Sequence, residues 1–158
     1  VALLTFLPGR LGWPPAAVLL PLLSLAGTFA AGVLARRMPA LRIAALALAA
    51  TVLLAGALAL LPDPQRLWAA LPMMIAIGMV PGASFAAIPE LNADQPSQAR
   101  ANGAVAQLGN VGTTFGPPLM ALILARYRFT GLAAYTAALS LLGLLTVLWI
   151  SRALRRRC

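Results

Sequence analysis

The sequence predicts an all-α, polytopic membrane helix bundle, and two observations lead to this fold class. Hydrophobic residues make up 61% of the 158 residues and charged residues only 9%, whereas a soluble domain carries about 25% charged residues. The charges also cluster, and they leave five uncharged runs at 11–35, 43–62, 67–89, 101–125 and 129–151. A helix needs roughly 20 apolar residues to cross a bilayer, and each run is long enough. So few charges could not cover the surface of a soluble protein.

Helices explain these runs better than strands do. Helices and closed barrels both satisfy backbone polar groups in lipid, but the runs lack the short alternation of barrel strands. They are rich in Ala and Leu, which favour helices. We expect spans at about 14–35, 43–61, 67–88, 101–125 and 130–151. The first apolar piece, 1–8, is too short to cross, and we interpret it as the end of a truncated span.

Proline, glycine and charged residues mark the links between these spans. The links are expected at 8–10, 36–39, 62–64, 89–98 and 126–128. Proline cannot continue a helix, which explains the first four. Because the links are short, consecutive helices should run antiparallel.

The basic residues, all of them arginine, give an orientation. Alternate links place Arg36, Arg37, Arg42, Arg100, Arg152, Arg155, Arg156 and Arg157 on one side, and Arg10, Arg66, Arg126 and Arg128 on the other. The positive-inside tendency puts the larger set, and with it the C-terminus, in the cytoplasm. We expect a bacterial inner (plasma) membrane. The arginines flank apolar runs, so the lipid bilayer and not nucleic acid is the expected partner; an anionic-lipid site at the C-terminal arginines stays open.

The expected helices differ in character. Spans 14–35, 67–88 and 101–125 contain prolines and glycines, which membrane helices tolerate where protein or a water-filled cavity surrounds them. Spans 43–61 and 130–151 have few polar side chains. We expect the first three helices to be interior and the other two to be peripheral, facing lipid on most sides.

The span 101–125 has two distinct faces on a helical wheel. Gln107, Asn110 and Thr114 share one face with Gly103, and they are candidates to line a solute path. An equally weighted alternative is that the amides only hydrogen-bond to neighbouring helices. The opposite face carries three glycines that favour close helix packing; these are Gly109, Gly112 and Gly116.

A second group of candidates lies in span 67–88. Pro81 removes a backbone hydrogen bond and should kink or hinge its helix between Gly78 and Gly82. This makes it a candidate gating helix, with a merely well-packed kink as the alternative. Ser84, one turn further on, is a further solute-path candidate.

Residues for catalysis or metal binding are scarce. The sequence has no His, its only cysteine is Cys158, and its three acids, Asp63, Glu90 and Asp94, lie in or beside links. No zinc, phosphate-loop, hydrolase or dinucleotide motif is present. We therefore expect no enzymatic activity, no metal and no cofactor.

Three passages resemble the C-terminal half of a major facilitator superfamily transporter, and the resemblance covers nearly all of residues 1–158. The first passage runs from Gly32 through Arg36 and Arg37 to Arg42. It looks like the second copy of the family's GxLaDRxGR loop, with Arg36 in place of the Asp. Residues 88–91 and 99–103 are similar to the link between helices 10 and 11. The glycines at 103, 112 and 116, with Pro117, have the G-x8-G-x3-G-P spacing of the antiporter motif.

The resemblance implies that 1–8 ends helix 7 and that the five spans are helices 8 to 12. Helices 7 and 10 would line the cavity, helices 9 and 12 would lie outside, and helices 8 and 11 would meet an N-terminal six-helix half. The implied function is secondary active transport of a small solute by alternating access, with proton-coupled efflux as one form. Because no acid lies within a span, any coupling carboxylate is expected in that other half. A permease subunit, another membrane bundle or a membrane-embedded enzyme are the alternatives.

Overall fold

The computed structural model describes residues 2–156, apart from the side chains of residues 2, 9, 10, 63, 64 and 128. The described residues form helices joined by short links and contain no strand. The helices are α1 (Ala2–Leu11), α2 (Ala16–Leu34), α3 (Ala40–Leu60), α4 (Asp63–Leu91) and α5 (Gln95–Arg155). The predicted all-α class is confirmed.

Five stretches in the described part of the chain are long and apolar enough to cross a membrane. They are Ala16–Leu34, Ala40–Leu60, Gln65–Leu91, Gln95–Tyr127 and Phe129–Arg155. The number of spans predicted from the uncharged runs is therefore confirmed, and these helices indicate an integral membrane protein. Large apolar side chains face outward along them, among them Leu53, Leu60 and Trp149, as lipid requires and water would not favour.

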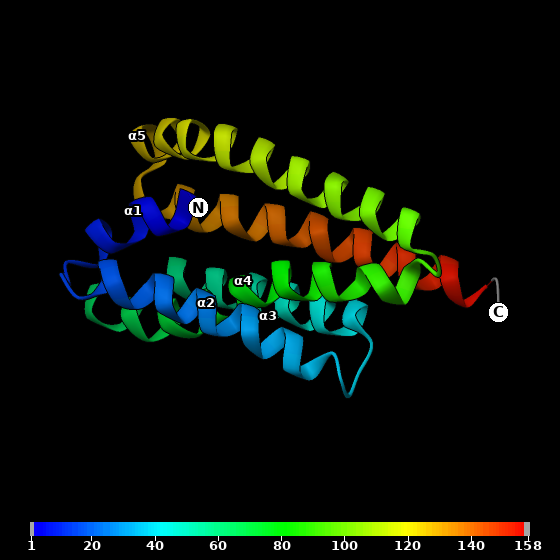
Figure 1. Cartoon of the computed structure of the whole chain (residues 1–158). Helices are drawn as coiled ribbons and strands as arrows, with labels where there is room; N and C mark the ends of the chain where they lie inside the picture. Colours follow the sequence, from blue (N-terminus) through cyan, green and yellow to red (C-terminus); the bar gives the residue numbers. More distant parts are fainter. Residues whose placement is uncertain (1, 157–158) are drawn as a thin grey trace.

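Helix α5 contains two of these spans because the chain folds back on itself within it. Figure 1 shows the ribbon reversing direction between the stretches Gln95–Tyr127 and Phe129–Arg155. A Cβ atom added to Gly131 would lie 2.9 Å from the Ile123 side chain. In a straight helix, residues eight apart are separated by about 12 Å along the axis, so this contact requires a sharp bend.

Helix α4 is central to the arrangement of the others. It packs along both α2 and α3, while α3 also packs along α5. Helices α2 and α3 are consecutive in the chain but touch only slightly. The short α1 lies against α2 and α5 (Figure 1). The expected antiparallel course of consecutive spans is visible in the same view.

Several helices extend further than the sequence indicated. Helix α1 runs through Pro8 to Leu11 and ends where Gly12 adopts a left-handed φ of 63°, a conformation that glycine allows at helix ends. Helix α4 starts at Asp63 and continues past Pro89 to Leu91, so its link to α5 is only 92–94. The expected links at 62–64 and 89–98 were thus too long, and the link expected at 8–10 lies at 12–15 instead, because proline is tolerated in the first turn of a helix and within membrane helices.

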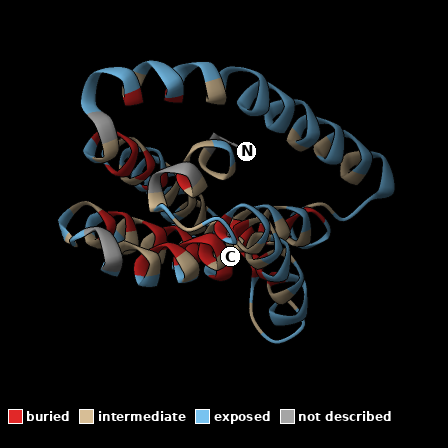
Figure 2. Ribbon diagram, turned by 90° about the vertical axis from the view of Figure 1, so that its left-hand side faces the viewer, coloured by how far each residue is buried: buried red, intermediate tan, exposed pale blue. Residues whose placement is uncertain are grey.

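The burial of the helices also differs from the expectation. In both α3 and α4, 39% of the apolar window is buried, against 11% in the stretch Gln95–Tyr127. Figure 2 shows this stretch as a mostly exposed helix across the top of the bundle. Within the described chain, span 43–61, expected at the periphery, is therefore more buried than span 101–125, which was expected in the interior. Small residues on one face of α3, such as Ala40, Ala44 and Ala47, bring it close to its neighbours.

The two sets of arginines lie at opposite ends of the bundle. The link from α2 to α3, the link from α4 to α5 and the end of α5 all lie at one end in Figure 1. This end carries Arg36, Arg37, Arg42, Arg100, Arg152, Arg155 and Arg156. The alternation of links inferred from the sequence therefore agrees with the arrangement of the helices.

Candidate functional site

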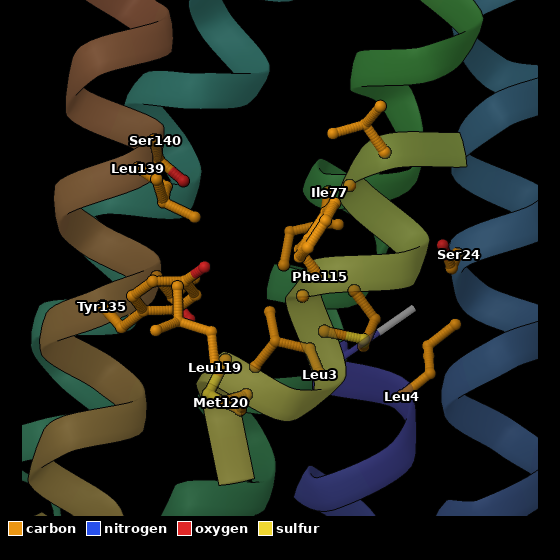
Figure 3. Close-up of a pocket in the computed structure, with 15 residues that line it drawn as sticks. Leu3, Leu4, Ser24, Ile77, Phe115, Leu119, Met120, Tyr135, Leu139 and Ser140 are labelled. Carbon is orange, nitrogen blue, oxygen red and sulfur yellow. The ribbon is translucent and has the colours of Figure 1, made fainter. Parts of the chain in front are cut away.

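A cavity of about 400 Å³ lies between the helices and has contributions from α1, α2, α4 and both stretches of α5. Its lining consists of Leu3, Leu4, Ser24, Met74, Ile77, Val111, Gly112, Phe115, Gly116, Leu119, Met120, Tyr135, Thr136, Leu139 and Ser140. Figure 3 shows these side chains converging on one space from separate helices. The cavity is larger than a second pocket of about 330 Å³ between α3 and α4.

Small residues on α5 create this space. An added Cβ at Gly112 would meet no atom within 4 Å, so the backbone of the first stretch of α5 borders open space there. Gly116, one turn later, also lines the cavity. On the facing stretch, Thr136 and Ser140 present small side chains one turn apart. Larger residues at these four positions would fill the space between the two stretches.

The cavity opens to the outside along α5. Phe115 is 68% exposed and Leu139 is 51% exposed, although both line the cavity. They come from the two opposite stretches of α5, so the opening lies between these stretches. Because both stretches are apolar enough to span a membrane, the opening lies between two candidate membrane spans.

In the described part of the chain, the polar side chains that line the cavity carry hydroxyl groups, and none of the lining residues is Arg, Lys, Asp or Glu. The Thr136 hydroxyl donates its proton to the carbonyl oxygen of Leu132 at 2.8 Å, so it can only accept from a ligand. The hydroxyl groups of Tyr135 and Ser140 point toward the space between the helices (Figure 3). A hydroxyl group can both donate and accept a hydrogen bond. The site can therefore bind an uncharged, largely apolar molecule that has one or two polar atoms.

The residues predicted to line a solute path lie elsewhere. Gln107, Asn110 and Thr114 are exposed and do not line the cavity. The Thr114 hydroxyl donates to the carbonyl oxygen of Asn110 at 2.9 Å. Ser84 is half-buried on α4 and donates to the carbonyl oxygen of Val80 at 2.9 Å. On α5, one face carries Gln107, Asn110 and Thr114, as the helical wheel predicted. That face is directed away from the cavity.

The glycine and proline candidates fall into two groups. Gly78 and Gly82 lie where α4 meets α2, and Pro81 between them is exposed. On α5, Gly116 lines the cavity, and Pro117 after it is half-buried. The remaining three glycines, at 103, 109 and 112, have open space where a Cβ would be. Close helix packing through glycine therefore occurs on α4 and not at these three positions of α5.

The contact between α2 and α4 brings backbone against backbone. A Cβ on Gly27 would overlap the carbonyl oxygen of Ile75, and a Cβ on Gly78 would overlap that of Ser24. The Thr28 hydroxyl lies 2.8 Å from the carbonyl oxygen of Gly78, to which it donates across the two helices. Small residues and hydroxyl groups are the usual means of helix association in membranes. This contact fixes the wall of the cavity that carries Ser24 and Ile77.

The candidates at the arginine-rich end surround the start of α3. Arg36, Arg37 and Arg42 are exposed there, and Gly32 makes no close contact. The carboxylate of Glu90, at the end of α4, accepts hydrogen bonds from the backbone N–H of Ala40 at 3.1 and 3.0 Å. A carboxylate stabilises the positive end of a helix dipole. Glu90 therefore ties the end of α4 to the beginning of α3.

A second acid caps α5 at the same end. The Asp94 carboxylate accepts a hydrogen bond from the backbone N–H of Ser97 at 2.8 Å. This bond, together with one from the Ser97 side chain, lowers the pKa of Asp94 from its ordinary value of 3.8. Hydrogen bonds to the charged form of an acid favour that form. Neither Glu90 nor Asp94 lines the cavity.

The hydroxyl-bearing residues of the cavity were not predicted from the sequence. Ser24 and Thr136 were not among the predicted solute-path residues, and neither were Tyr135 and Ser140, which belong to the span expected to have few polar side chains. A usable signal was present, because Tyr135, Thr136 and Ser140 fall on one side of a helix at 100° per residue. A helical wheel of the last span therefore has a polar face, as the wheel of span 101–125 does.

Comparison with known proteins gave no match to a family model, to a curated protein or to a solved structure.

Proposed function

We propose that the chain is the C-terminal part of a secondary active transporter of the major facilitator type, which carries a small solute by alternating access. The observation that carries the proposal is the cavity of about 400 Å³ between the membrane helices. Small-molecule sites have volumes of about 300–1,000 Å³, whereas purely structural bundles pack closely and leave few voids larger than water. A bundle that handles a solute needs such a space between its spans.

The exposed polar face of α5 supports the proposal that a second group of helices packs against it. Gln107 and Asn110 lie midway along the stretch Gln95–Tyr127, and their side chains are exposed. An amide group at this depth has neither water nor lipid as a hydrogen-bond partner, and leaving it unsatisfied costs several kcal/mol. Contact with an N-terminal six-helix half would provide partners, as polar side chains do between membrane helices. The proposal therefore gives these amides a role in joining the two halves.

The arginines support an orientation for the transporter. With the end that carries Arg36, Arg100 and Arg152 in the cytoplasm, the chain obeys the positive-inside tendency. The C-terminus then lies in the cytoplasm, and a bacterial inner membrane is the proposed location. The turn of α5 near Tyr127 lies on the opposite side.

The first test is of alternating access and needs no knowledge of the solute. Ser140→Cys is introduced together with Cys158→Ser into the complete coding sequence, in right-side-out and everted membrane vesicles. We expect a membrane-impermeant maleimide to label the new cysteine from one side at rest. Labelling should shift to the other side when a proton gradient is imposed. Labelling that is equal from both sides, or that does not respond to any ion gradient, would contradict alternating access.

The second test is of energy coupling. Labelled neutral, anionic and cationic small solutes are offered to vesicles that contain the wild-type protein, with and without a protonophore or a sodium ionophore. We expect the gradient of the transported solute to collapse with the ion gradient. A gradient that survives the ionophores and requires ATP would instead favour a permease subunit.

A further inference from the structure

We infer that the solute of this cavity is an uncharged, mostly apolar molecule, of about the size of two fused aromatic rings with a single polar group, which enters from the bilayer. The inference rests on the proposed function in so far as it names the transported solute. The binding step itself can be measured without transport.

The charge of the solute follows from the lining. Among the residues whose side chains the structure describes, no acidic or basic one borders the cavity. Glu90 and Asp94 lie at the arginine-rich end of the bundle and have other roles, since Glu90 binds the start of α3 and Asp94 caps α5. An ion moved into such a site would lose its hydration without gaining a counter-charge, which costs far more than burying a neutral group. The lining therefore selects against both anions and cations.

The size and shape of the solute follow from the space and its walls. A cavity of about 150 Å³ lined by apolar side chains holds one benzene molecule, so about 400 Å³ accommodates a molecule of two fused rings. Phe115 from one stretch of α5 and Met74 from α4 contribute to the walls. A Phe ring stacks on aromatic ligands, and a Met thioether makes favourable contacts with ring edges.

The polar group of the solute has defined partners. Tyr135 and Ser140 direct their hydroxyl groups into the space (Figure 3). The Thr136 hydroxyl has its proton bound to Leu132 and leaves a free lone pair. These groups suit a single hydroxyl or amide of the ligand, which can donate to one oxygen and accept from another.

The route of entry follows from the opening between the two stretches of α5. Both Val111 and Leu139 border the cavity and are more than half exposed, at 54% and 51%. The opening therefore faces acyl chains, where apolar molecules concentrate and ions do not. A solute of this kind reaches the site without first crossing the aqueous phase.

Binding can be tested with three probes that share one ring system. The full chain in lipid nanodiscs is titrated by calorimetry with 1-naphthol (neutral), 1-naphthoate (anion) and 1-naphthylmethylammonium (cation). We expect saturable binding of 1-naphthol, with the two ions at least about tenfold weaker. Empty nanodiscs provide the baseline for partitioning into lipid.

Variants distinguish the cavity from the lipid. Leu139→Trp fills the opening and should abolish saturable naphthol binding. Leu141→Trp, on the same helix at an exposed position outside the lining, is the matched control and should bind as the wild type does. Tyr135→Phe removes one hydroxyl group and should weaken binding about two- to tenfold. Retained near-ultraviolet circular dichroism and thermal unfolding show that each variant is folded.

The outcomes separate this inference from the proposed function. Naphthol binding that survives Leu139→Trp, or naphthoate binding as tight as naphthol binding, overturns the inference even if the protein transports a charged solute. Saturable, cavity-dependent naphthol binding supports the ligand class. If the vesicles then show no ion-coupled movement of any solute, the transporter proposal fails and the binding site stands.

Discussion

Replacing Gly78 with alanine tests the closest contact in the bundle. A Cβ atom at this position would overlap the carbonyl oxygen of Ser24, and it would lie 2.6 Å from the carbonyl carbon and 2.8 Å from the Cα of the same residue. All three are backbone atoms, so no side-chain rotation can relieve the overlap. Helix α2 or α4 must move as a whole, and the wall of the cavity moves with it.

Three contributions determine the size of the effect. Overpacking a well-packed interface costs about 1–3 kcal/mol. Separation of the helices also lengthens the hydrogen bond from Thr28 to the Gly78 carbonyl, now 2.8 Å, and such bonds between membrane helices contribute about 0.6 kcal/mol on average. Alanine opposes both losses, since it favours helix over glycine by about 1 kcal/mol. We expect a net loss of about 0.5–2.5 kcal/mol in the free energy of unfolding.

The assay is unfolding in mixed micelles, followed by circular dichroism, with a matched glycine as control. Gly56→Ala on α3 introduces the same methyl group where nothing lies within 4 Å, so only the gain in helix propensity remains and stability should rise slightly. If Gly78→Ala were as stable as Gly56→Ala, the close approach of α2 and α4 would be refuted. A larger residue, as in Gly78→Leu, should lower stability further.

Substitutions at three further residues test contacts at the two ends of the bundle. Glu90→Gln should lower the free energy of unfolding by about 0.3–1 kcal/mol, less at high salt, because its charge at the start of α3 is lost while an acceptor for the Ala40 N–H remains. Glu90→Gln and Asp94→Asn should leave proton-coupled transport intact, and loss of coupling in either would place the coupling acid in this chain. The pKa of Asp94 in the folded chain lies below its ordinary value of 3.8. The stabilisation by its charge is therefore complete above the pKa of the unfolded chain and is lost as the pH falls through the lower folded pKa. Asp94→Asn should remove this pH dependence from the free energy of unfolding measured between pH 2 and 5. Phe129→Leu removes the ring that lies 4.4 Å from the Arg66 guanidinium and should cost about 0.5–2 kcal/mol, whereas Phe129→Tyr, which keeps a ring, should cost less.

The spans could be predicted from the sequence because lipid imposes a simple rule. A charged side chain in the middle of a span is costly, so uncharged runs mark the helices, and all five agree with the structure. The prolines predicted the ends of the helices less well. Proline ends helices in water, but α4 continues through Pro72, Pro81 and Pro89. The position of the fold-back near Tyr127 was predicted from Arg126 and Arg128, although the helix continues through both residues.

The neighbours of each helix could not be predicted from its polarity. Helix α3 has one polar side chain within its apolar run, Thr51, and this residue is buried, with its hydroxyl donating to the carbonyl oxygen of Ala47. The expected peripheral position of α3 was based on that lack of polar groups. In lipid, however, apolar side chains gain little from leaving the solvent, and small residues decide which faces can approach. The alanines of α3 were the relevant signal.

The cavity could not be predicted from the sequence for a related reason. Its lining depends on which faces of the two α5 stretches oppose each other, and that is set by the fold-back near Gly131. Three of the four glycines in span 101–125, Gly109, Gly112 and Gly116, were expected to bring a neighbouring helix close. Of these, Gly112 and Gly116 border open space instead, because the facing residues, Thr136 and Ser140, are also small. Small residues on one helix promote contact only if the partner reaches them.

The two polar faces of α5 suit different tasks, one directed away from the cavity and the other lining it. The amides of Gln107 and Asn110 each offer two donors and an acceptor, so they need several partners at fixed positions, which a second protein surface provides better than a mobile solute. The hydroxyl groups of Tyr135 and Ser140 need only one partner each and can rotate to find it. A hydroxyl also loses less than an amide when no ligand is bound, because it can turn to a nearby backbone carbonyl, as Thr136 does. A site that must be empty for part of a transport cycle is therefore better lined by hydroxyl groups, and the amides are better placed where contact is permanent.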